Sequence, residues 1–276
     1  SVGGQDLGGN NLEISRLALS RFKSVYGLKA VELIEPSTTL ILELSRESRK
    51  PDRLKQVEDK VVLAEINKLV RDIERNVLSG DLDPIVVAGF YNKLQTGNIS
   101  TKKRSVYAKK VYEIYREEFG DDAEQTLKAK FDLINTRPAN KRIKEYERIL
   151  PLMEELSEPQ RWHWWVHQTL SRFYFQKNKV QQAEYHLQRA GQVGENLSSE
   201  QVIPLIKVAP KYPRGAFQQG ITGYVLLEFS VSKRGTVEAP FVVESSPKHV
   251  FEEAAINAAL QFRYIPAYSE GAPLRV

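Results

Sequence analysis

Residues 223–231 read Gly-Tyr-Val-Leu-Leu-Glu-Phe-Ser-Val, a segment in which apolar side chains recur at every second position. This period predicts a β-strand with one buried face, because successive side chains of a strand point to opposite sides. The predicted buried face holds Val225, Leu227, Phe229 and Val231, and the opposite face holds Tyr224, Leu226, Glu228 and Ser230. Residues 232–235 follow as a hairpin turn that ends on a glycine, which readily adopts positive φ.

The returning strand is predicted over residues 236–245, with Val237, Phe241 and Val243 on a shared face. Pro240 lies inside this strand and cannot donate to the hydrogen-bond ladder, which indicates a bulge or an edge position. The two strands therefore form an antiparallel hairpin, around which the C-terminal part of the chain is organised.

Flanking segments complete a small module of mixed α and β structure. Upstream, two prolines in residues 210–213 stiffen the chain, and a short helical turn is expected after them. Downstream, Ser246 is the predicted N-cap of a helix with Pro247 at its first position. Apolar residues then recur at helical spacing, at Phe251, Ala254, Ala255, Ala258 and Phe262. Pro266 makes helix unfavourable beyond this point.

The order and spacing of these pieces over residues 204–276 resemble the C-terminal domain family of TonB. The resemblance is carried by Pro210-Lys-Tyr-Pro213, Gly220-Ile-Thr-Gly223, the strand Val225 to Val231, Gly235, Ser246-Pro247 and Phe262-Arg-Tyr-Ile-Pro266. It implies a β-β-α domain with an antiparallel sheet. Family members continue past the Tyr-x-Pro segment into a further strand, which in this sequence would begin at Leu274–Val276.

The resemblance also implies a function. TonB-like domains lie in the periplasm and carry energy from an inner-membrane motor to outer-membrane receptors by binding a short extended peptide, the TonB box. The implied partners are TonB-dependent outer-membrane receptors and transducer components of the ExbB/ExbD type. The residues expected to bind the receptor peptide are Lys211, Tyr212, Pro213, Tyr264, Leu274, Arg275 and Val276.

Bulk properties narrow the class of protein. A length of 276 residues suggests about two domains, and 41% hydrophobic and 27% charged residues are ordinary for a globular protein. The absence of cysteine excludes disulfides, thiolate metal sites and cysteine nucleophiles. The net charge of +5 is spread along the chain and forms no basic stripe for nucleic acid. No apolar run reaches the roughly 18 residues of a membrane span, and because the sequence starts at Ser1 a signal peptide or anchor is expected outside it.

The sequence before the hairpin predicts helices. Residues 1–11 are rich in glycine and read as a flexible leader, residues 12–197 as a helical-repeat domain, and residues 198–276 as the TonB-like domain. One helix is expected to end at Pro36, and Ser37 is expected to cap the next. Residues 121–124, Asp-Asp-Ala-Glu, have the spacing of a capping box.

One helical hairpin, at about residues 163–196, resembles a tetratricopeptide repeat. The resemblance rests on Leu170-Ser171, Tyr174, Ala183, Leu187 and Ala190, where small side chains let two helices approach and large ones fill the gap. An earlier hairpin fits the same spacing loosely, with Val111, Ile114, Ala123 and Leu127. His167 departs from the pattern, which usually has a large apolar residue there. The predicted architecture of this part is an α-solenoid of tetratricopeptide-like hairpins.

Several residues invite a chemical interpretation. Trp162 and Trp165 are expected to pack between helices, and Trp164 to face a groove on the opposite side. His163 and His167 have the spacing of a metal-ligand pair, but no further ligand completes a site, so a structural role is favoured. The sequence shows no nucleophile elbow, phosphate loop or catalytic carboxylate pair, and it predicts no catalytic, cofactor or metal site.

A basic run at Lys102, Lys103 and Arg104 is, with Trp164, the candidate surface for a second partner, although a solvated face is the default interpretation. The sequence therefore predicts an α+β protein without enzymatic activity, located in the periplasm and acting in TonB-dependent energy transduction. The alternative is a scaffold for cell-wall or envelope assembly that binds peptidoglycan and carries a degenerate TonB-like module.

Overall fold

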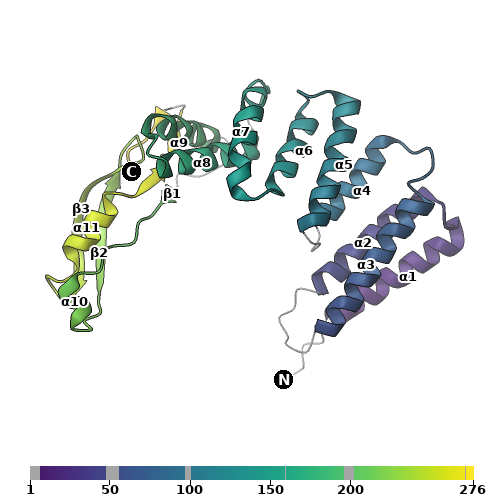
Figure 1. The fold of residues 1–276 in the computed structure, drawn as a ribbon, viewed down its shortest axis with the longest axis horizontal. Helices are drawn as coiled ribbons and strands as arrows, with labels where there is room; N and C mark the ends of the chain where they lie inside the picture. The colour runs from purple at the N-terminus through teal and green to yellow at the C-terminus, as the bar shows by residue number, and fades with distance from the viewer. Residues whose placement is uncertain (1–6, 48–55, 97–100, 159, 196–201, 271) are drawn as a thin grey trace. The chain divides into compact units, whose positions relative to one another are not determined.

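The structure is a computed structural model that describes residues 7–47, 56–96, 101–158, 160–195, 202–270 and 272–276 (Figure 1). It divides into two compact units, Ser1–Arg142 and Ile143–Val276, and each is described by itself. The first unit is helical, and the second joins helices to small antiparallel sheets, which confirms the α+β class. The predicted division at residue 197 stays a prediction, because residues 196–201 lie outside the described part of the chain.

The first unit is built from helices, each of which packs against at least one neighbour in sequence. These are α1 (Leu7–Tyr26), η1 (Val31–Leu33), α2 (Ile34–Glu47), α3 (Gln56–Asn76), α4 (Pro84–Thr96), α5 (Thr101–Phe119) and α6 (Glu124–Asn135). Its core is formed by apolar residues at helical spacing, such as Ile66, Val70 and Ile73 of α3 and Val77 directly after it. These side chains share one cluster with Leu40, Leu44 and Phe90 from α2 and α4, because each amphipathic helix buries its apolar stripe against other helices.

Three predictions about helix ends in this unit are wrong. Gly27, with a φ of 82°, follows the end of α1, and Pro36 lies inside the first turn of α2, where a missing N–H costs no helical hydrogen bond. Ser37 therefore lies within α2 and does not cap it. The N-cap of α6 is Ala123, without a side-chain cap, so residues 121–124 do not form a capping box. Helix α1 begins at Leu7.

The second unit holds α7 (Ala139–Glu154) from Ile143 onward, followed by α8 (Arg161–Gln176) and α9 (Val180–Glu195). Helices α8 and α9 form the expected hairpin, and Leu170, Ser171, Ala183, Leu187 and Ala190 are all buried between elements. The Ser171 hydroxyl donates to the Ala183 carbonyl oxygen at 2.8 Å, so the two helices are also joined by a polar contact. The tetratricopeptide character of this hairpin remains a prediction from the sequence.

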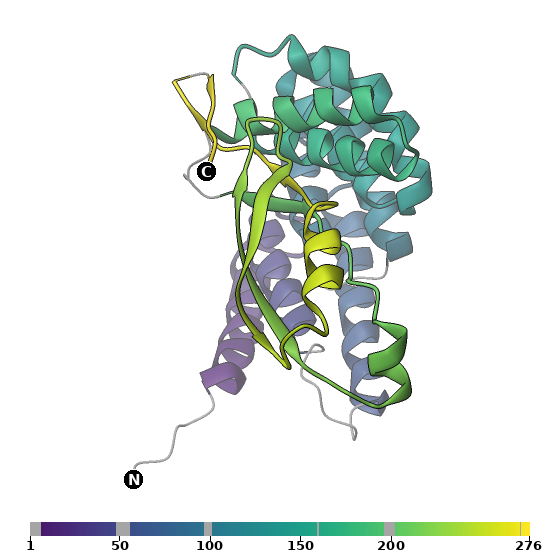
Figure 2. The ribbon, with the colours of Figure 1, turned by 90° about the vertical axis from the view of Figure 1, so that its left-hand side faces the viewer.

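The C-terminal domain follows in the order β1 (Ile203–Ile206), α10 (Arg214–Gln218), β2 (Tyr224–Val231), β3 (Val237–Ser246), α11 (Glu252–Ala259), β4 (Arg263–Ile265), β5 (Tyr268–Ser269) and β6 (Ala272–Pro273). The strand pairs β2–β3, β1–β4 and β5–β6 are antiparallel. Helix α11 covers the inner face of the β2–β3 hairpin (Figure 2). Val231, Val237, Ala259 and Tyr264 form the core beneath it.

The hairpin confirms the main prediction and corrects two details. Its turn closes at Gly235 with a φ of 75°, and β2 alternates as expected from Tyr224 to Phe229, whereas Ser230 on the outward side is half-buried. The register of β3 shifts twice, between Glu238 and Phe241 and between Val242 and Glu244, and Ala239 has a φ of 47°, so Pro240 lies in a bulge. An extra residue reverses the side on which later side chains point. Phe241 and Val243 are therefore exposed, whereas Val237 is buried.

The start of α11 also differs from its prediction. Ser246 is the last residue of β3, and α11 begins only at Glu252, with Phe251 as its N-cap. The Glu252 carboxylate accepts hydrogen bonds from the Ser245 hydroxyl at 2.6 Å and from the backbone N–H of His249 and Phe251. These bonds, of which the Ser245 contact contributes most, lower the pKa of Glu252 to about 2. A carboxylate in the first helical turn thus takes the place of the expected serine cap.

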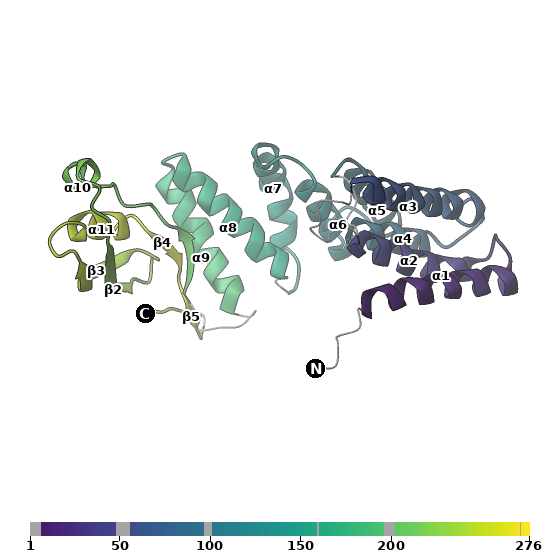
Figure 3. The same cartoon turned by 90° about the horizontal axis from the view of Figure 1, so that it is seen from below.

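Helix α9 lies directly against strands β4 and β5 (Figure 3) and also contacts β6, and strand β1 contacts α8. Leu187 and Ala190 of α9 share one apolar cluster with Leu205 of β1 and Ile265 of β4. A side chain at Gly191 would come within 2.3 Å of the Tyr268 ring and 3.0 Å of the Pro266 carbonyl oxygen. The α8–α9 hairpin and the TonB-like domain therefore share a core, which the sequence did not predict.

Candidate functional site

The candidate site is the edge of β2 that faces away from β3. At one end of this edge, Val276 and Val231 exchange backbone hydrogen bonds, with N–O distances of 3.0 and 2.5 Å. This reciprocal pair is the pattern of an antiparallel ladder, so Val276 occupies the position of a third strand. Over the rest of β2, no other strand of the described chain is paired to this edge.

The backbone of β2 is regular along the whole edge. Both register shifts in the hairpin place the additional residue in β3, so β2 keeps its two-residue period. Because Val231 directs its N–H and C=O toward Val276, the groups of Phe229, Leu227 and Val225 point the same way. The edge therefore offers a row of donors and acceptors at strand spacing.

The exposed side chains beside this edge are apolar. Tyr224 and Leu226 of β2 and Phe241 and Val243 of β3 are each more than half exposed, on the face of the hairpin away from α11. At the other end of the hairpin, the Arg275 guanidinium lies 3.2 Å from the Glu238 carboxylate, which holds the C-terminal segment beside the sheet. An added strand here would bond through its backbone and pack its alternate side chains on this apolar face.

The predicted peptide-binding residues divide into two groups. Val276 pairs with the β2 edge, whereas the neighbouring Arg275 bonds to Glu238 of β3 and the Leu274 N–H donates to the Ala267 carbonyl oxygen at 2.8 Å. Tyr264 does not belong with them, because its side chain is buried in the domain core, where it packs on Phe229. Burial raises the pKa of the Tyr264 phenol. Tyr264, the tyrosine of the segment Phe262–Pro266, therefore has a packing role in this chain.

Lys211, Tyr212 and Pro213 line a separate cavity of about 450 Å³ next to α11. The Tyr212 and Phe251 rings pack in an edge-to-face arrangement, with a centroid distance of 5.4 Å. The Tyr212 hydroxyl donates to the Ile221 carbonyl oxygen at 2.5 Å. These contacts fix the proline-rich entry segment to the start of α11. The segment is therefore ordered, and the cavity that it lines could accept a side chain of a bound peptide.

The second predicted surface is divided among different environments. Lys102 lies in the first turn of α5, with its side chain outside the described part, and the Lys103 ammonium donates to Asn67 of α3. Burial lowers the pKa of Lys103. Arg104 lines a cavity between helices α4, α5 and α6. The predicted basic run is therefore not one continuous solvated patch.

The tryptophans also differ from expectation. Trp162 is buried as predicted, but Trp165 is 51% exposed and Trp164 packs beside the cluster of Leu187 and Ile265. The side of α8 that carries Trp164 is covered by the C-terminal domain, which the sequence of the helix does not reveal. Trp165, not Trp164, is the exposed aromatic residue of α8.

The histidines form a buried network with a structural role. His163 accepts the Gln160 N–H at Nδ1 and donates from Nε2 to the Met153 carbonyl oxygen, both at 2.8 Å. The Nδ1 atoms of His167 and His186 lie 3.0 Å apart, so one ring donates to the other. Burial lowers the pKa of His167 to about 3 and that of His186 to about 4, so both rings are neutral. No cluster of metal-binding residues occurs among the side chains that the structure describes.

Comparison with known proteins defines the class of the C-terminal domain. Residues 208–276 match the family model described as Gram-negative bacterial TonB protein C-terminal. This segment is therefore a TonB-type C-terminal domain, as the sequence motifs indicated.

A curated relative supports the same assignment. The chain is 32% identical over 82 residues to Protein TonB of Pseudomonas aeruginosa (strain PAO1). The match covers 30% of this chain and 24% of the relative, so the chain spans about a quarter of the relative's length. Within the described residues, no helix has the length and apolar character needed to cross a membrane.

Proposed function

We propose that this chain belongs to a non-enzymatic protein of TonB-dependent energy transduction that acts on the periplasmic side of the envelope. In this proposal, the C-terminal domain binds the TonB box of an outer-membrane receptor by strand addition along the β2 edge. The observation that carries it is the reciprocal pairing of Val276 with Val231 in a domain of TonB type. That pairing supports an edge that accepts an additional strand.

The energetics of strand addition suit a coupling protein. Each backbone hydrogen bond contributes only about 0.5–1.5 kcal/mol net, because it replaces bonds to water. A short peptide along Val225–Phe229 therefore binds weakly and dissociates readily. The apolar face of Tyr224 and Leu226 would add selectivity through alternate side chains of the peptide. Reversible binding is what a protein needs if it must engage and release its receptor.

The helical first unit is proposed to hold a second protein, such as a component of the inner-membrane motor of ExbB/ExbD type. Stacked helices present long surfaces between neighbouring elements, and such surfaces commonly bind other polypeptides. The support in this chain is the cavity between α4, α5 and α6, which is lined by polar side chains.

A disulfide-trapping experiment tests the peptide site. The chain has no cysteine, so a single Glu228→Cys variant carries a unique thiol. Glu228 lies between the backbone-bonded positions of the β2 edge, where the Cβ atoms of facing strands are closest. It would be mixed with synthetic TonB-box peptides that carry one cysteine at each successive position. Strand addition predicts strong crosslinking at one peptide position and weaker crosslinking two positions away.

A Val243→Cys variant provides the matched control, because Val243 is exposed on β3 of the same hairpin. It should trap the peptide poorly. Equal trapping by both thiols, or trapping that ignores the position of the peptide cysteine, would count against strand addition at β2.

A further inference from the structure

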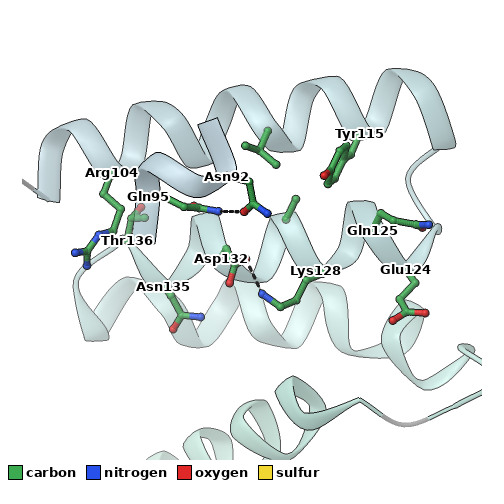
Figure 4. A pocket seen from close by; sticks show the side chains of 12 residues that line it. Asn92, Gln95, Arg104, Tyr115, Glu124, Gln125, Lys128, Asp132, Asn135 and Thr136 are labelled. Atoms are coloured by element: carbon green, nitrogen blue, oxygen red, sulfur yellow. Dashed lines mark hydrogen bonds and ion pairs between the residues drawn. The ribbon is translucent and has the colours of Figure 1, made fainter. Parts of the chain in front are cut away.

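A cavity of about 680 Å³ lies in the first unit between α4, α5 and α6 (Figure 4). Most of the residues that line it carry a polar group, including the amides of Asn92, Gln95, Gln125 and Asn135. An amide side chain carries both a donor and an acceptor, the same pair that a peptide unit presents. The lining is therefore suited to the backbone of another polypeptide.

This groove has one unpaired charged side chain at each end and an ion pair in its centre. In the middle, the Lys128 ammonium donates to the Asp132 carboxylate at 2.6 Å. Arg104 lies at one end, near Thr136, and Glu124 lies at the other, near Gln125 (Figure 4). Neither Arg104 nor Glu124 has an ion-pair partner among the described residues. The groove thus has a positive end and a negative end.

The positive end has an unsatisfied hydrogen-bond donor. The Arg104 Nε atom is shielded from solvent and has no hydrogen-bond partner in the described structure. A buried donor without a partner is costly, and a guanidinium binds a carboxylate more strongly than any neutral acceptor. This end of the groove therefore favours an acidic group.

The groove length sets the size of the occupant. Glu124 and Asn135 are eleven residues apart on α6, which is about 16 Å along a helix axis at 1.5 Å per residue. An extended chain rises about 3.3 Å per residue, so roughly five residues span this distance. The presence of both charge signs disfavours a polyanion such as nucleic acid, which Glu124 and Asp132 would repel.

We propose that this groove binds an extended segment of a second protein, about five residues long, with an acidic group at Arg104 and a basic group at Glu124. The amides and the Lys128–Asp132 pair between them contact the segment backbone. This inference rests on the proposed role of the helical unit in holding a second protein, and it adds the site and the chemistry of the partner.

Binding of charge-spaced peptides to the full chain tests the proposal. The probes are fluorescein-labelled peptides with blocked ends that carry one lysine and one glutamate separated by one to eight neutral residues. Fluorescence anisotropy should show the tightest binding with three or four neutral residues between the charges. Because a charge-assisted hydrogen bond contributes about 1.5–3 kcal/mol, Arg104→Gln should weaken this peptide about tenfold or more.

A charge reversal separates recognition from loss of folding. Arg104→Glu should lose the lysine–glutamate peptide and gain a matched peptide with two lysines, which an unfolded variant cannot do. Lys109→Gln is the matched control, since Lys109 is an exposed residue of α5 outside the groove, paired at 3.4 Å with Glu113. It should leave the affinity unchanged.

Three results overturn the proposal: no peptide binds, the affinity is independent of spacing, or Lys109→Gln has the same effect as Arg104→Gln. The β2 edge is tested by a different peptide and a different thiol. If no peptide binds in the groove, the trapping of TonB-box peptides by Glu228→Cys can still succeed. If strand addition fails, the binding of charge-spaced peptides to the groove can still succeed.

Discussion

Gly191→Ala should destabilise the second unit, although alanine is the better helix former. Gly191 lies inside α9, where replacing glycine by alanine ordinarily gains about 1 kcal/mol. Here the new methyl group would lie 2.3 and 2.7 Å from two Tyr268 ring atoms and 3.0 Å from the Pro266 carbonyl oxygen. The ring can turn away, but the carbonyl belongs to the backbone between β4 and β5.

The two effects have opposite signs and the steric effect is larger. Overpacking of this kind costs about 1–3 kcal/mol. With the helix gain subtracted from the upper half of that range, we expect a net loss of about 1–2 kcal/mol in the free energy of unfolding. Separation of α9 from the β4–β5 segment would relieve the clash at the expense of the cluster around Leu187 and Ile265.

Urea denaturation followed by tryptophan fluorescence measures this change directly. All three tryptophans of the chain lie in α8, so their emission reports the unfolding of the second unit. Gly194→Ala is the matched control in the same helix, because its methyl group would meet Trp164 at an ordinary 3.5 Å. It should be neutral or slightly stabilising.

The outcome that refutes this reasoning is a Gly191→Ala variant as stable as the parent chain. Such a result would mean that α9 does not approach Tyr268 and Pro266 as closely as described. A Tyr268→Leu substitution removes the clashing ring atoms. It should therefore recover part of the loss in the Gly191→Ala background, and a double-mutant cycle would measure the coupling.

Three further predictions concern the core, the histidines and the sheet edge. Leu187→Ala removes a side chain that is 1% exposed, and it should cost about 2–5 kcal/mol in urea denaturation, whereas Leu260→Ala at a 46% exposed position should cost far less. The neutral pair of His167 and His186 should make the second unit less stable as the pH falls from about 6.5 toward 4. Their folded pKa values are about 3 and 4, below the ordinary value of 6.5, so the unfolded chain binds more protons in that window. At 1.36 kcal/mol per pH unit, each histidine lowers the free energy of unfolding by about 2 kcal/mol at pH 5. In the His186→Phe variant, the free energy of unfolding should fall less steeply with decreasing pH. An unchanged slope would contradict the role given to the histidine pair. Finally, Val225→Pro removes one donor from the β2 edge without breaking the β3 ladder. It should weaken TonB-box binding by about two- to tenfold in a titration, with little change in thermal stability.

The sequence was sufficient for features that depend on local periodicity. The two-residue period of β2 and the positive-φ glycine at Gly235 predicted the hairpin correctly. The helical spacing around Leu187 and Ala190 correctly identified the buried faces of the α8–α9 hairpin. In each case, the signal comes from neighbours within one element, where chain geometry leaves few choices.

Predictions failed where a distant contact decided the environment. A register shift at Pro240 moved Phe241 to the exposed face, and a second shift includes Val243, which is also exposed. His186 escaped notice because its partner, His167, is nineteen residues away on another helix. Arg104 appeared as part of a basic run, but packing of α5 against its neighbours left its Nε atom buried in a groove.

The order of strands, turns and helices, and the TonB type of the last seventy or so residues, could be inferred from residue pattern because they depend on local backbone preferences and motif spacing. Only the folded chain showed that β1 and β4 pack on the α8–α9 hairpin, that Tyr264 is a core residue, and that Val276 pairs with Val231. These contacts join segments far apart in sequence. The free energy of such contacts depends on which surfaces meet in space, and that information is not contained in any one segment.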